Sequence, residues 1–138
     1  MLFRSEKRDP ANTTWQRDLS ISHERIGNAL RSQGYGRDAL KAYQKSLEIK
    51  ETLTKLDPAN TQWQVDLTIV CLNLGTLENV LAPSTRRAHL QRGLAILLRL
   101  KDSGKLHPSQ DNTALFVKQI QKLDAVVVPF PWTGAKPS

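Results

Sequence analysis

The feature that most constrains this chain is a 13-residue segment that occurs twice, 48 residues apart. Residues 9–21 read DPANTTWQRDLSI and residues 57–69 read DPANTQWQVDLTI, so ten of the thirteen positions are identical. A match of this length within 138 residues indicates tandem copies of one structural unit. The chain is therefore expected to fold as an array of similar units that pack on their neighbours.

Each copy is predicted to open a pair of helices. The proline at its second position ends any preceding helix, and the asparagine and threonine that follow can cap the next one. Apolar residues at helical spacing predict helices over residues 13–33 and 37–56 in the first unit, joined by a glycine turn. The same pattern predicts helices over residues 61–81 and 85–101 in the second unit. Because the connections are short, the two helices of each unit are expected to pack antiparallel.

The remaining segments complete the predicted domain organisation. Residues 1–8 are expected to end a preceding helix, residues 9–56 to form the first unit, and residues 57–106 a second, degenerate unit. Residues 107–126 contain a fifth predicted helix that carries Phe116, Ile120 and Leu123 on one face and would cap the second unit. Residues 127–138 contain three prolines with Phe130 and Trp132, which predicts an extended tail that packs back on the helices or binds a partner.

Eight positions of the first unit follow the pattern of a known repeat. They are Ile26, Gly27, Leu30, Gly34, Ala39, Tyr43, Ser46 and Leu47. Their types and spacing resemble the tetratricopeptide repeat (TPR), although the period of 48 exceeds that family's usual period of about 34 residues. The opening Asp-Pro-x-Asn-x-x-Trp-Gln is similar to that of long-period bacterial members. The resemblance implies an all-α fold of about five helices, stacked as a short superhelix of antiparallel repeats.

The same resemblance implies a function and a site. The TPR concave face is lined by the first helix of each unit and binds a peptide or a partner protein. The matching positions here are Arg25, Asn28, Ser32, Asn73, Thr76 and Asn79. The lysines used by family members that grip a peptide carboxylate are absent, so an extended or helical peptide in the groove is the more open expectation. The alternative is that these six side chains are simply solvated.

The two equivalent tryptophans, Trp15 and Trp63, could stack on a ligand or pack between helices. Their identical placement in both units favours packing. Because no complete helix precedes the first one, Trp15 and Leu19 are expected to leave apolar surface exposed. A homodimer through the N-terminal helix end is therefore a further expectation.

The net charge of +7 and the isoelectric point near 9.9 suggest nucleic-acid binding as a hypothesis, which the distribution of the charge can support or weaken. The positive charge is concentrated in residues 86–106, which sum to +5. Arg86, His89, Arg92 and Arg99 form a candidate basic patch for nucleic acid or an acidic partner, and a solvated outer helix face is the alternative. No aromatic residue is interleaved with these arginines, which disfavours binding of single strands.

No catalytic pattern is present in the sequence. The three histidines lie in different segments without metal-ligand spacing, and the single cysteine, Cys71, lies between Val70 and Leu72 as a buried thiol would. We therefore expect no enzyme activity, no catalytic or metal-binding residue and no cofactor. No stretch approaches the roughly 18 apolar residues of a membrane helix, so no membrane association and a cytoplasmic location are expected.

Overall fold

The computed structural model describes residues 10–127, and within that range the chain is helical without β-strands. The predicted all-α class with five α-helices is confirmed. The elements are α2 (Pro10–Ser32), α3 (Gly36–Leu56), α4 (Thr61–Gly75), α5 (Pro83–Asp102), the short 3-10 helix η1 (Pro108–Gln110) and α6 (Thr113–Val127). The predicted N-terminal stub, and residues 128–138 of the predicted tail, lie outside the described residues.

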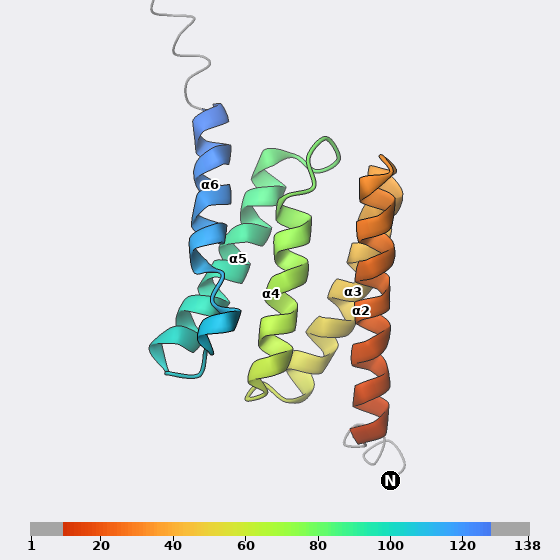
Figure 1. Cartoon of the computed structure of the whole chain (residues 1–138), viewed down its shortest axis with the longest axis vertical. Helices are drawn as coiled ribbons and strands as arrows, with labels where there is room; N and C mark the ends of the chain where they lie inside the picture. The colour runs from red at the N-terminus through yellow and green to blue at the C-terminus, as the bar shows by residue number, and fades with distance from the viewer. Residues whose placement is uncertain (1–9, 128–138) are drawn as a thin grey trace, which may run out of the picture.

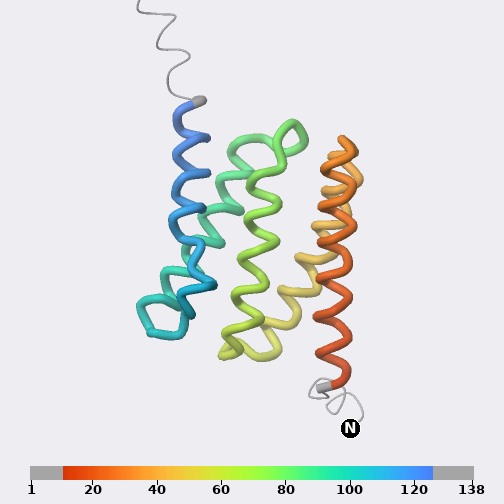
Figure 2. The backbone as a smooth tube through the Cα atoms, viewed as in Figure 1, coloured from red at the N-terminus to blue at the C-terminus, as the bar shows by residue number. Residues whose placement is uncertain are grey.

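The helices form two antiparallel hairpins and a final single helix. Figure 1 shows α2, α4 and α6 in front, with α3 and α5 behind them. Each helix packs mainly on the next one along the chain, so α4 lies in the middle between α3 and α5. The backbone trace in Figure 2 shows how short the turn between α2 and α3 is, compared with the wider loop between α4 and α5.

Small residues allow the two helices of each hairpin to approach closely. A Cβ atom added to Gly27 of α2 would lie 2.6 Å from the Tyr43 ring of α3, which is fully buried. A Cβ atom added to Gly75 of α4 would lie 2.4 Å from Leu90 of α5. Gly27 and Gly75 are equivalent in the two units, and so are Tyr43 and Leu90. Both hairpins therefore close through the same kind of contact, between a glycine of the first helix and a large residue of the second.

The predicted third helix is too long, because α4 ends at Gly75 and not at Leu81. Arg31 donates hydrogen bonds to the carbonyl oxygens of Asn73 and Thr76, and Arg86 donates to that of Gly75 at 3.0 Å. A continuing helix would need these carbonyls for its own N–H groups. The chain instead turns, with Asn79 in the left-handed region at φ 66°.

The two copies of the repeated segment also begin their helices differently. In the second copy, the Asn60 side chain accepts a hydrogen bond from the Trp63 amide at 3.0 Å, and α4 begins at Thr61 as expected. In the first copy, α2 already begins at Pro10. Proline is tolerated there because the first helical amides have no intrahelical partner.

A second apolar cluster attaches α6 to the second unit. Phe116 and Leu123 of α6 are buried with Leu90 and Leu97 of α5, and Leu72 of α4 packs against them. A Cβ atom on Gly93 would lie 2.4 Å from the Phe116 ring, so this glycine makes room for α6. The final helix covers the far side of the second unit through apolar contacts, in the place where a capping helix was predicted.

Candidate functional site

The six residues predicted to line the binding face divide into two groups. Four of them make hydrogen bonds within the protein: Asn28 accepts from the Tyr43 hydroxyl at 2.6 Å, Asn73 donates to Glu24 at 3.1 Å, the Thr76 hydroxyl donates to the Leu72 carbonyl at 2.8 Å, and the Ser32 hydroxyl donates to the Ala29 carbonyl at 3.0 Å. The other two, Arg25 and Asn79, are exposed. The side chains expected to contact a peptide are therefore, in part, the ones that connect the helices to each other.

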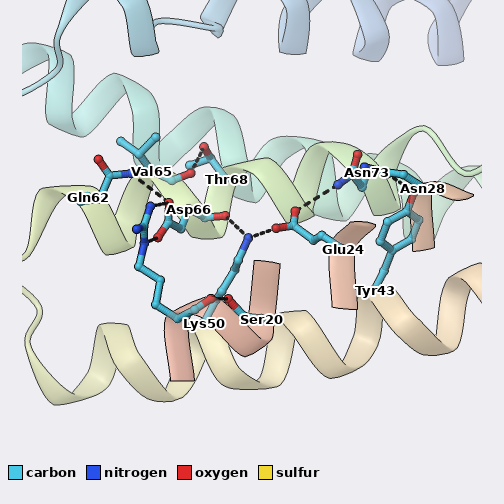
Figure 3. A network of polar contacts seen from close by, with 11 residues as sticks. Ser20, Glu24, Asn28, Tyr43, Lys50, Gln62, Val65, Asp66, Thr68 and Asn73 are labelled. Carbon is cyan, nitrogen blue, oxygen red and sulfur yellow. Dashed lines mark hydrogen bonds and ion pairs between the residues drawn. The ribbon is translucent and has the colours of Figure 1, made fainter. Parts of the chain in front are cut away.

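A buried lysine is the centre of these connections (Figure 3). The Lys50 side chain from α3 is 2% exposed, and its ammonium group donates to the Glu24 carboxylate of α2 and to the Asp66 carbonyl oxygen of α4 at 3.0 Å. Glu24 also accepts from Asn73. Burial raises the pKa of Glu24, and the neighbouring Lys50 charge opposes that rise. One lysine thus ties α2, α3 and α4 together.

Three polar side chains of α2, each seven residues from the next, reach across to α4. The Arg17 guanidinium donates to the Asp66 carboxylate, with the Nε–Oδ2 distance at 2.6 Å, and Glu24 accepts from Asn73. Arg31 donates to the Thr76 hydroxyl at 3.1 Å. We call these three contacts the α2–α4 ladder. A seven-residue spacing keeps all three side chains on one side of a helix.

The ladder was not predicted from the sequence, because its partners lie 45 to 49 residues apart along the chain. A signal for it exists in the comparison of the two copies. Arg17 of the first unit stands where the second unit has Val65, and Glu24 stands where it has Leu72. The second unit has neither charge: Val65 belongs to the apolar cluster shared by α3, α4 and α5, and Leu72 packs against the cluster that binds α6.

The two units also differ in how much of their first helix is covered. One face of α2 is not covered by any part of residues 10–127. We call it the outer face of α2, and it consists of Trp15, Asp18, Ser22, Arg25, Ile26 and Ala29. Trp15 is 63% exposed and Ile26 is 51% exposed. Asp18 and Arg25 form no ion pair with another described residue.

The equivalent face of α4 is covered by the first unit. Its residues are Trp63, Asp66, Val70, Asn73, Leu74 and Leu77, each 48 positions further along. Val70, Leu74 and Leu77 belong to one apolar cluster with Ala39 and Tyr43 of α3. Asp66 is bound by Arg17. The face that packs on a helical hairpin in the second unit is therefore left exposed by residues 10–127 in the first, where serine and alanine stand in place of Val70 and Leu77.

The predicted basic patch is not one open cationic surface. Arg86 caps α4 through the Gly75 carbonyl, and Arg92 pairs with Glu51 at 2.6 Å. Burial, together with the nearby Arg92 charge, lowers the pKa of His89, which disfavours the charged form of this histidine. Arg99 is exposed and lines a shallow groove with Arg92. Only part of the charge counted in the sequence is available to a polyanion.

Basic residues next to the patch are also paired. Arg87 forms an ion pair with Asp124 of α6, and Lys101 lies 2.9 Å from the Asp111 carboxylate that precedes α6. These pairs join α5 to α6 and to the segment that precedes α6, in addition to the apolar cluster. Arg87 and Lys101 are therefore engaged within the protein.

Other kinds of site have no counterpart in the described part of the chain. Residues 10–127 contain no group of three or more histidine, cysteine or acidic side chains that could hold a metal ion. Cys71 is a buried core residue, as predicted. Its burial raises the pKa of the thiol to about 11, which disfavours the reactive thiolate. None of the described helices has the length and apolar character needed to cross a membrane.

Comparison with known proteins identifies no relative of this chain. No protein-family model matches the sequence, and neither a curated protein nor a solved structure matches it significantly. The resemblance to the tetratricopeptide repeat therefore rests on the quoted residues of the first unit, and the function must be argued from the surfaces described above.

Proposed function

We propose that this protein is a non-catalytic scaffold that binds a partner protein, and that the outer face of α2 is its principal contact surface. One observation carries the proposal: Trp15 and Ile26 are 63% and 51% exposed, whereas at the equivalent positions of α4 Trp63 is half-buried and Leu74 is 1% exposed. In the second unit the equivalent face of α4 packs on a helical hairpin. The outer face of α2 has the same position on an equivalent helix, so another helical element can pack there.

The composition of the face also favours a protein partner. A large aromatic and an isoleucine supply apolar area, and Asp18 and Arg25 supply one charge of each sign. A polyanion would be repelled by Asp18 and would gain a single arginine. The concave face predicted to bind a peptide offers fewer free polar groups, because Asn28 and Asn73 already form hydrogen bonds within the protein.

A photocrosslinking amino acid at position 22 tests the proposal. Ser22 is exposed in the middle of the outer face, so a photoreactive side chain there should capture a bound protein in the host cell. The matched control places the same amino acid at Gln91, which is exposed on α5. Capture of protein from position 22 and not from position 91 is expected. Equal capture from both positions, or capture of nucleic acid from position 91 alone, would contradict the proposal.

A further inference from the structure

We infer that the outer face of α2 binds the same face of a second copy of this chain, in an antiparallel and two-fold symmetric helix pair centred near Ser22. The inference rests on the proposed function, because it names the partner of that surface. A symmetric dimer uses one patch twice, so the patch must be complementary to itself. The outer face of α2 meets this requirement in both size and charge.

Size complementarity follows from the spacing along the helix. Trp15 and Ala29 lie seven residues on either side of Ser22, which places each about 10.5 Å from the centre along the helix axis. In an antiparallel pair, Trp15 of one copy therefore lies at the level of Ala29 of the other. The largest side chain of the face meets a small one at both ends. Ser22 meets its own counterpart at the centre, where a small residue allows close approach.

Charge complementarity follows from the same geometry. Asp18 precedes Ser22 by four residues and Arg25 follows it by three. In the antiparallel pair, Asp18 of one copy and Arg25 of the other lie on the same side of the centre, about 1.5 Å apart along the axis. The length of the arginine side chain bridges the space between two packed helices. Two reciprocal ion pairs result, made by charges that have no ion-pair partner among residues 10–127.

The fold itself selects this face of the second copy. The surface that covers α4 is formed by α2 and α3 of the same chain, so in a second copy it is already occupied by that copy's own α4. The outer face of α2 is the surface of this type that both copies have available. A single pair of helices of this length makes a small interface, which predicts a weak dimer in exchange with monomer.

Sedimentation analysis of the full chain over a range of concentrations tests the inference. The wild type is expected to associate to a dimer. Asp18→Arg and Arg25→Asp each place like charges opposite one another twice in the symmetric pair, so each should weaken association about tenfold or more. The double variant Asp18→Arg/Arg25→Asp restores the pairs with reversed signs and should recover association to within about threefold of wild type.

Matched controls separate this effect from a change of net charge. Asp102→Arg and Arg99→Asp make the same changes of charge at exposed positions on α5 and should leave the dimer unaffected. Helical content by circular dichroism confirms that each variant is folded. A monomeric wild type, a double variant no better than the single ones, or controls that weaken the dimer equally would each overturn the inference. The proposed function fails separately, if position 22 captures no protein at all.

Discussion

At the scale of single residues, the structure depends most on Lys50, a charged side chain that is almost completely buried. It has two partners on two different helices, the Glu24 carboxylate and the Asp66 carbonyl oxygen. Buried charges are stable only when they are paired and hydrogen bonded. Lys50 therefore fixes the relative positions of α2, α3 and α4 more than it adds to the net stability.

Replacing Lys50 with methionine is expected to lower the free energy of unfolding by about 3 kcal/mol, because Glu24 is left buried without its counter-charge. Urea denaturation measures the change. The double variant Glu24→Gln/Lys50→Met should be more stable than Lys50→Met alone, since it removes the stranded charge. Lys45→Met, at an exposed position of the same helix, is the matched control and should change stability by less than about 0.5 kcal/mol. Equal losses at positions 45 and 50 would contradict the role of the buried pair.

Gly27 gives a second prediction at this scale. Alanine raises helix propensity by about 1 kcal/mol, but its Cβ atom would lie 2.6 Å from a fully buried tyrosine ring. Overpacking of a rigid ring costs about 1–3 kcal/mol, so Gly27→Ala should destabilise the protein in spite of the better propensity. Ser22→Ala on the exposed side of the same helix should be neutral or slightly stabilising in the same thermal unfolding experiment. A stabilised Gly27→Ala variant would mean that α2 and α3 are further apart than described.

At the scale of elements, the two hairpins bind their next neighbour by different means. The first unit holds α4 through the α2–α4 ladder and Lys50, in addition to the apolar cluster that α3 and α4 share. The second unit has Leu72 where the first has Glu24, and Leu97 where alignment of Tyr43 with Leu90 places Lys50. Both leucines belong to the apolar cluster that binds Phe116 of α6. The change from charged to apolar residues gives the second unit an apolar surface that matches the buried face of α6.

The start of α6 gives a pH-dependent prediction. Asp111 accepts hydrogen bonds from Thr113 and pairs with Lys101, which lowers the pKa of its carboxyl from 3.8 to about 2. A carboxyl whose pKa is lower in the folded state stabilises that state above its unfolded pKa and loses this effect as the pH falls toward its folded pKa.

The stability difference between wild type and Asp111→Asn should therefore be largest above pH 4 and should shrink as the pH falls from about 4 to about 2. Hydrogen exchange of the α6 amides reports the same change locally, whereas the amides of α2 and α3 serve as the internal control. A difference that stays constant over this range would show that Asp111 does not act through its charge.

At the scale of the whole molecule, the repeated segment and the hydrophobic spacing predicted the helical class, the two hairpins and the capping helix. They did so because these features depend on local patterns, such as the contact of Gly27 with Tyr43. The end of α4 was not predictable in this way, since Arg31 reaches it from 42 residues away in sequence. The burial of Lys50 depends on helices that meet only in three dimensions. The pairing of Arg92 in the predicted basic patch was not predictable either, because its partner Glu51 of α3 lies 41 residues away along the chain.

The exposure of two equivalent tryptophans tests whether residues 10–127 leave open on α2 the face that is covered on α4. Hydroxyl-radical footprinting followed by mass spectrometry measures the oxidation rate of each side chain. In dilute protein, Trp15 should be oxidised much faster than Trp63, in agreement with its exposure of 63%. When a partner occupies the outer face of α2, Trp15 should become protected while Trp63 stays unchanged. Equal rates in dilute protein, or a Trp15 that stays reactive in the bound state, would contradict the account.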